Sequence, residues 1–160
     1  MSAWILEPIT LEELRLHARS LVDLLDQIGA TSAEQALLPP DFVAGYLPAV
    51  HPDWVGVRAM TPERLIVGTG GYKGHPVEGE IEIGYGVSPH WEGQGVATAI
   101  AGWLSERAIR MGCQRVIAHT LPEGFASQKV LTKCGFVLAG SVHDPDDGEV
   151  LRWVFEPSGP

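Results

Sequence analysis

The sequence has little cysteine, little positive charge and no long hydrophobic run. Only two of its 160 residues are cysteines, and Cys113 and Cys134 are too few and too far apart for a disulfide framework or a thiolate metal cluster. Its 11 Lys and Arg residues against 20 Asp and Glu residues give a formal net charge of −9. This charge argues against broad nucleic-acid binding, which depends on neutralising phosphates. We expect both cysteines to fill core space, and we expect no nucleic-acid partner.

Other absences concern membranes and metals. No apolar stretch approaches the roughly 20 residues that cross a bilayer, and the first residues, MSAWILEPIT, lack the basic start and apolar run of a signal peptide. The six histidines have no ligand spacing, so we expect no metal. The sequence thus predicts a cytoplasmic protein without a membrane partner, folded as one domain over residues 1–160. Its acidity slightly favours small cationic substrates.

Hydrophobic periodicity predicts both helices and strands. Helical spacing covers 10–29, 95–111 and 125–135, and Thr10 with Glu13 forms a capping box at the start of the first helix. The segment from 30 to 53 contains four prolines and indicates broken helix and loop. Strands are expected at 4–10, 54–60, 64–74, 79–87 and 115–120, with a closing hairpin of 136–142 and 149–155. This order predicts a mixed sheet of the α+β class.

The stretch VSPHWEGQGVATAIAGWL, residues 87–104, places two glycines at the start of a helix, where Ser or Asp would cap better. Without side chains, Gly93 and Gly95 let backbone N–H groups approach an anion, and the helix N-terminus adds partial positive charge. Neither the P-loop nor the dinucleotide fingerprint fits WEGQGVATA. The spacing therefore predicts a phosphate-binding loop of another kind.

This loop resembles the pyrophosphate loop of the GNAT N-acetyltransferases, in which Gln or Arg, two residues, Gly, one residue and Gly or Ala follow one another. Here the loop runs from Glu92 to Ala97. A second stretch, ASQKVLTKCGF from Ala126 to Phe136, is similar to a later motif of the ribosomal-protein N-acetyltransferase branch. The resemblance covers most of 54–155. It implies a GNAT-like mixed, mostly antiparallel sheet of six to seven strands with helices on both faces.

The resemblance further implies transfer of an acetyl group from acetyl-CoA to a primary amine, on a small molecule or a protein N-terminus. The end of the 79–87 strand would pair with the pantetheine arm, and Gly84 and Gly86 fit a bulge or a close backbone approach there. Lys129 and Lys133 either reach the outer phosphate or lie on a solvated face. The expected cofactor-binding residues are Tyr85, Val87, Gly93, Gln94, Gly95, Val96, Ala97, Thr98, Ser127 and Lys129.

Two residues are the candidates for catalysis. A protonated amine must lose a proton before it attacks, and Glu82 lies where relatives often carry a glutamate, so it is the predicted base. The alternative is that Glu82, like Glu80 on the same strand face, is merely solvated. Ser127 either orients the cofactor thiol or caps its helix. His119 follows on the next strand and could line the same crevice.

Three departures from the family pattern leave the function open. Glu92 replaces a cationic or amide residue, so its carboxylate is expected to point outward and pyrophosphate binding to rest on the backbone. Gly124 replaces the usual Asn, and the 125–135 helix has no Tyr to protonate the leaving thiolate. A non-catalytic CoA-binding sensor of the same fold is therefore the alternative, and nucleotide binding without CoA fits only the loop. A homodimer through the final hairpin or the 125–135 helix is a further expectation.

Overall fold

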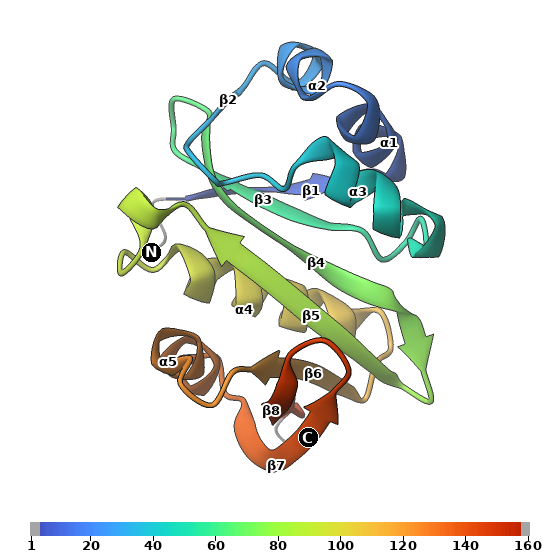
Figure 1. Ribbon diagram of the computed structural model, residues 1–160, viewed down its shortest axis with the longest axis vertical. Helices are drawn as coiled ribbons and strands as arrows, with labels where there is room; N and C mark the ends of the chain where they lie inside the picture. Colours follow the sequence, from blue (N-terminus) through green and yellow to red (C-terminus); the bar gives the residue numbers. More distant parts are fainter. Residues whose placement is uncertain (1–3, 158–160) are drawn as a thin grey trace.

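The structure is a computed structural model that describes residues 4–157 (Figure 1). Strands and helices alternate irregularly along the chain, and two single turns of 3-10 helix follow α3 and β5. The elements are β1 (Ile5–Ile9), α1 (Leu11–Arg19), α2 (Leu21–Ile28), β2 (Thr31–Ser32), α3 (Pro40–Tyr46), β3 (Gly56–Met60), β4 (Leu65–Val77), β5 (Glu80–Val87), α4 (Val96–Arg110), β6 (Arg115–Thr120), α5 (Phe125–Lys133), β7 (Val137–Asp144) and β8 (Gly148–Phe155).

One mixed sheet organises these elements. Its strand order is β1-β3-β4-β5-β6-β8-β7, and the two-residue strand β2 pairs with β4 outside this path. The pairs β5–β6 and β2–β4 are parallel, and the other pairs are antiparallel. The α+β class and the mostly antiparallel sheet are confirmed. The strand β2 is an addition, because two residues are too short to show a period in sequence.

The expected helix over 10–29 is wrong as a single helix. The capping box of Thr10 and Glu13 is present, but Ser20 is extended, with φ −160° and ψ 108°, and separates α1 from α2. Its main-chain N–H donates to Leu16 O, and its hydroxyl accepts from Asp23 N–H at 3.2 Å. Ser20 thus ends one helix and caps the next, because a serine hydroxyl competes well for main-chain donors.

The turn expected at 74–79 is shorter than predicted, because β4 continues to Val77. The pairing with β5 shifts between Lys73 and Val77, and Gly74 within this irregularity has φ 75°. A bulge tolerates Pro76, which has no N–H to donate to a ladder. The chain reverses at Glu78 and Gly79, whose φ values are 52° and 79°.

Helices cover both faces of the sheet, as expected. On one face α4 packs against β3, β4 and β5 and buries Ile100 and Leu104 with Val57, Ile81 and Ile83 (Figure 1). On the other face α1, α2 and α3 lie over β3 and β4, where Leu14, Leu24 and Val43 border one cavity with strand residues. Among residues 4–157, no helix is long and apolar enough to span a membrane.

Candidate active site

The strands β5 and β6 separate where the sequence placed the ligand crevice. Their parallel pairing runs only from Glu80 opposite Arg115 to Glu82 opposite Ile117, although β5 continues to Val87. The residues of β5 after Glu82 remain paired with β4 on their other side. The separation leaves the β6-facing backbone of this strand end available to a ligand.

A cavity of about 490 Å³ lies beside this strand end. It is bordered by β5, the glycine loop and the first turns of α4 and α5. Nine of the ten expected cofactor-binding residues line it. These are Tyr85, Val87, Gly93, Gly95, Val96, Ala97, Thr98, Ser127 and Lys129, and they are joined by Gly86, Trp91, Glu92, Ala126, Val130 and Lys133.

The tenth expected residue, Gln94, does not line this cavity. Its side-chain amide donates to His90 O at 3.4 Å on the exposed outside of the loop. Glu92 is exposed and borders the cavity. Lys129 and Lys133 both line it, so two ammonium groups are available on the α5 side. The cavity therefore combines cationic side chains with a helix N-terminus.

The start of α4 provides main-chain donors. Gly95 is its N-cap, with φ 88°, and no side chain caps the helix. Hydrogen bonding within the helix begins with Ala99 N–H donating to Gly95 O at 3.0 Å, which leaves the N–H groups of Val96, Ala97 and Thr98 without intrahelical partners. A Cβ at Gly93 or Gly95 would meet no atom within 4 Å, so the space above the loop is open. Such an arrangement binds anions.

A tyrosine and a serine meet at the deep end of this cavity. The hydroxyls of Tyr85 on β5 and Ser127 on α5 are 2.8 Å apart. Burial raises the pKa of Tyr85 above its ordinary value, so its hydroxyl is protonated at neutral pH. The N-cap of α5 is Gly124, and no side chain, that of Ser127 included, makes a capping hydrogen bond to this helix. The interpretation of Ser127 as a cap is therefore wrong.

Glu82 lies in a charged cluster outside the cavity. Its Oε2 accepts from Lys73 Nζ and from His119 Nδ1, each at 3.0 Å. Burial opposes its ionisation, but the hydrogen bonds from His119 and Lys73 outweigh burial and hold the pKa of Glu82 below its ordinary value. His119 Nε2 is buried and has no hydrogen-bond partner among residues 4–157. Glu82 is therefore already engaged, while one imidazole nitrogen is free.

Glu80 has a different environment on the same strand face. Its carboxylate binds Arg115 at 3.2 Å and Arg152 at 2.7 Å. The sequence analysis expected Glu80 to be solvated, but its carboxylate is held in ion pairs with residues of β6 and β8. This pairing joins three neighbouring strands at the end of β5 that lies away from the glycine loop.

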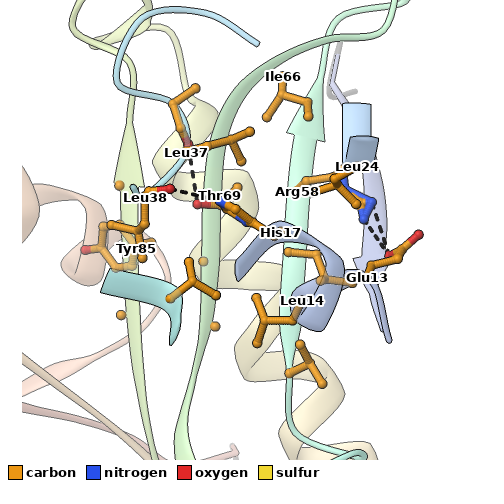
Figure 2. Close-up of a pocket in the computed structure, with 18 of the residues that line it drawn as sticks. Glu13, Leu14, His17, Leu24, Leu37, Leu38, Arg58, Ile66, Thr69 and Tyr85 are labelled. Carbon is orange, nitrogen blue, oxygen red and sulfur yellow. Dashed lines mark hydrogen bonds and ion pairs between the residues drawn. The ribbon is translucent and has the colours of Figure 1, made fainter. Parts of the chain in front are cut away.

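A second cavity, of about 270 Å³, lies on the face of the sheet covered by α1, α2 and α3 (Figure 2). It shares Tyr85 and Gly86 with the first cavity. A Cβ at Gly86 would meet no atom within 4 Å, so no side chain obstructs this point. The two cavities therefore border the same point at the end of β5.

The geometry agrees with a family comparison. Residues 41–137, more than half of the chain, match the family described as the acetyltransferase (GNAT) domain. The chain belongs to the GNAT acetyltransferase family. The resemblance found in the glycine loop and the ASQKVLTKCGF stretch is thereby confirmed. No curated protein matches the sequence.

Solved structures share the GNAT fold at low identity. The ribosomal-protein-S5-alanine acetyltransferase of Vibrio fischeri has a TM-score of 0.70 at 16% identity, over 98% of this chain and 94% of that one. A spermidine N-acetyltransferase mutant of Vibrio cholerae has 0.68 at 14%, over 98% and 95%. A Salmonella typhimurium protein described as an acetyltransferase and solved with acetyl-CoA has 0.66 at 13%, over 97% and 94%. These likenesses establish the fold alone.

The sequence analysis did not assign a role to the hydroxyl of Tyr85, because the resemblance directed the search for an acid to the 125–135 helix. Tyr85 was predicted to bind the cofactor because its strand end would pair with the pantetheine arm, and no role was predicted for its side chain. It also missed Lys73, which lies nine residues before Glu82 and reaches it across the β4–β5 hairpin. The antiparallel register places Lys73 directly opposite Glu82. A hairpin alignment of the two strands could have found this pair.

Proposed function

We propose that this protein transfers the acetyl group of acetyl-CoA to a primary amine by direct attack on the thioester. The observation that carries the proposal is the meeting of two cavities at Tyr85 and Gly86, one suited to an anionic cofactor and the other mainly apolar. The amine nitrogen forms a bond to the carbonyl carbon, and the carbon–sulfur bond breaks. The ammonium group gives up one proton before the attack and a second one after it; the leaving thiolate takes up one proton, and the other passes to solvent.

The first cavity fits CoA. The free N–H groups of Val96, Ala97 and Thr98 would hold the pyrophosphate, and Lys129 and Lys133 supply positive charge beside it. Beyond Glu82, the unpaired edge of β5 is available to hydrogen-bond the pantetheine arm. A main-chain N–H aimed at the developing oxyanion would lower the activation free energy by about 3 kcal/mol.

The hydrogen bond between Glu82 and His119 supports a role for His119 in removing the proton of the amine. The low pKa of Glu82 makes its carboxylate a weak base near neutral pH. When His119 donates Nδ1–H to Glu82, the lone pair of a neutral imidazole lies on Nε2, the buried nitrogen without a partner. His119 follows Ile117, where β5 and β6 separate. His119 is not among the residues that line either cavity, so we assign it acceptance of a proton relayed from the amine by water, and we assign orientation of its ring to Glu82.

The Tyr85–Ser127 pair supports protonation of the leaving thiolate. Both residues line the CoA cavity, and Tyr85, whose pKa is raised by burial, carries its proton at neutral pH. The hydrogen bond to Ser127 fixes where the phenol points. Tyr85 would thus supply the acid that the sequence of α5 lacks.

The test couples thiol release from acetyl-CoA, over a panel of amines, with calorimetric titration of CoA. We expect Glu82→Gln and His119→Gln to lower turnover on the order of 10²-fold while CoA affinity stays within about threefold. Tyr85→Phe should slow turnover in the same way. Glu80→Gln is the matched control, because it makes the same change on the same strand face, and its turnover should stay within about threefold of wild type.

The outcomes separate the alternatives. Full turnover in both Glu82→Gln and His119→Gln would assign proton removal to another group. Tight CoA binding with no acetylation of any amine would favour the non-catalytic sensor. Binding of ATP as tight as that of CoA would favour a nucleotide site, since only the glycine loop would then be in use.

A further inference from the structure

The second cavity carries an inference about the acceptor, which rests on the proposed function. It lies between the sheet and the helices α1, α2 and α3 (Figure 2). It shares the lining residues Tyr85 and Gly86 with the CoA cavity. An acceptor amine must approach the thioester from the side that CoA does not occupy. This cavity is therefore the place where the rest of the acceptor molecule would lie.

The walls of the cavity are mainly aliphatic. Helix residues and the segment between β2 and α3 supply half of the lining residues, and the strand side includes glycines of β4 and β5. The aliphatic lining residues drawn from these elements include Leu14, Leu24, Leu37, Leu38, Val43 and Ile66. An apolar surface of this kind stabilises a hydrocarbon or aromatic group by removing it from water.

The one carboxylate among the described lining residues is already neutralised. Glu13 Oε1 accepts from Arg58 Nη2 at 2.6 Å and also from Thr10 N–H at 3.0 Å. Arg58 is only 2% exposed, and its other terminal nitrogen binds Glu7 at 3.1 Å. Figure 2 shows Glu13 and Arg58 directed toward each other at one side of the cavity. The cavity thus offers no free carboxylate to a second ammonium group.

His17 adds no positive charge at neutral pH. Burial lowers its pKa, which outweighs the hydrogen bond to Leu38, and the charge of Arg58 lowers it further. Since Leu38 O can only accept, the 2.9 Å contact requires that Nε2 carries the proton, which leaves Nδ1 as an acceptor. Although the chain has a net charge of −9, none of its unpaired carboxylates among residues 4–157 lines this cavity. A polycation that entered it would lose bound water and find no carboxylate to pair with.

Volume limits the size of the acceptor. An apolar cavity of about 150 Å³ holds benzene, and this cavity has a volume of about 270 Å³. It can hold one aromatic ring with a short aliphatic chain. We infer that the acceptor is a primary monoamine on an apolar, otherwise uncharged body, with the amine at Tyr85 and Gly86 and the body among the leucines of α1, α2 and the β2–α3 segment.

The test compares kcat/KM for three acceptors at saturating acetyl-CoA: 2-phenylethylamine, spermidine and a short peptide with an N-terminal alanine. We expect at least a tenfold preference for 2-phenylethylamine. Equal or better use of spermidine or of the peptide would overturn the inference. Calorimetry with 2-phenylethanol, which lacks the amine, reports on the cavity even if no acceptor is acetylated, so the two proposals can fail separately. Absence of phenylethanol binding to the CoA complex would overturn the inference.

A charge placed at Leu38 sharpens the test. Leu38 lines the cavity and is 43% exposed, so a polar residue can be accommodated there. Leu38→Asp should raise the ratio of spermidine to 2-phenylethylamine activity about tenfold relative to Leu38→Asn, which has the same size and no charge. CoA affinity should be equal in both variants. If Asp and Asn give the same ratio, the acceptor does not lie in this cavity.

Discussion

At the scale of single residues, His17 shows how burial changes a side chain that its sequence neighbours do not mark. It lies on α1, is 5% exposed and donates to the carbonyl of Leu38, 21 residues away. The pKa of His17 is lowered in the folded protein, whereas the unfolded chain takes up a proton near 6.5. Protons therefore favour the unfolded state, and this contribution to stability is lost as the pH falls below 6.5.

We predict that the free energy of unfolding falls between pH 7.5 and pH 5.5, with His17 contributing at most about 1.4 kcal/mol per pH unit. Gln can donate to Leu38 O in the same way, so His17→Gln should reduce this pH dependence without large loss at pH 7.5. Urea unfolding at the two pH values measures it. His75→Gln, at an exposed position of β4, is the control. An unchanged pH dependence in His17→Gln would mean that His17 is protonated in the fold.

At the scale of elements, the glycine loop and α4 act as one unit. Gly95 combines φ 88° with open space above it, so a side chain there strains the backbone and occupies the position that a phosphate would take. The helix behind it is anchored, since Ile100 and Leu104 are buried in the core. The loop can therefore change its affinity for an anion while α4 stays in place.

We predict that Gly95→Val weakens acetyl-CoA binding by about 2 kcal/mol or more, near 30-fold. The control is Gly102→Val, the same change within α4 at a position where a Cβ would meet nothing within 4 Å. Its CoA affinity should match that of wild type. Calorimetric titration measures both, and circular dichroism checks that each variant is folded. Wild-type affinity in Gly95→Val would refute the phosphate interpretation of WEGQGVA.

At the scale of the whole molecule, β7 forms one edge of the sheet and exposes apolar side chains. β7 ends the strand order, and Val137, Leu138 and Val142 on it are 69%, 50% and 37% exposed. An exposed apolar edge strand favours pairing with another chain. Helices α1 to α4 lie away from β7, whereas α5, which borders the first cavity, directly precedes it in the chain (Figure 1). No residue of β7 lines either cavity.

We predict a homodimer through β7, with Leu138→Lys shifting it to the monomer. Val22→Lys, at an exposed apolar position on α2, is the control and should remain dimeric. Sedimentation equilibrium at micromolar concentration measures the mass against the 17.2 kDa of one chain. A wild-type mass near that of one chain would exclude the dimer at this concentration.

The sequence by itself determined the features that depend on neighbouring residues. Capping at Thr10, the glycines before α4 and the order of strands and helices follow local rules of hydrogen bonding and hydrophobic period, so they were predicted. The break at Ser20 was not, because the hydrophobic spacing continues across it while the serine hydroxyl competes for the backbone.

Only the tertiary structure decided which distant groups meet. Ser127 is 42 residues from Tyr85, and His119 is 37 residues from Glu82, yet each pair lies within hydrogen-bond distance. Those contacts depend on where β5 and β6 separate and how α5 packs, which no local pattern encodes. The second cavity arises in the same way, because helices from the first 50 residues enclose it against strands that follow later. Chemistry between remote residues is set by packing, whereas the phosphate loop is set by its own sequence.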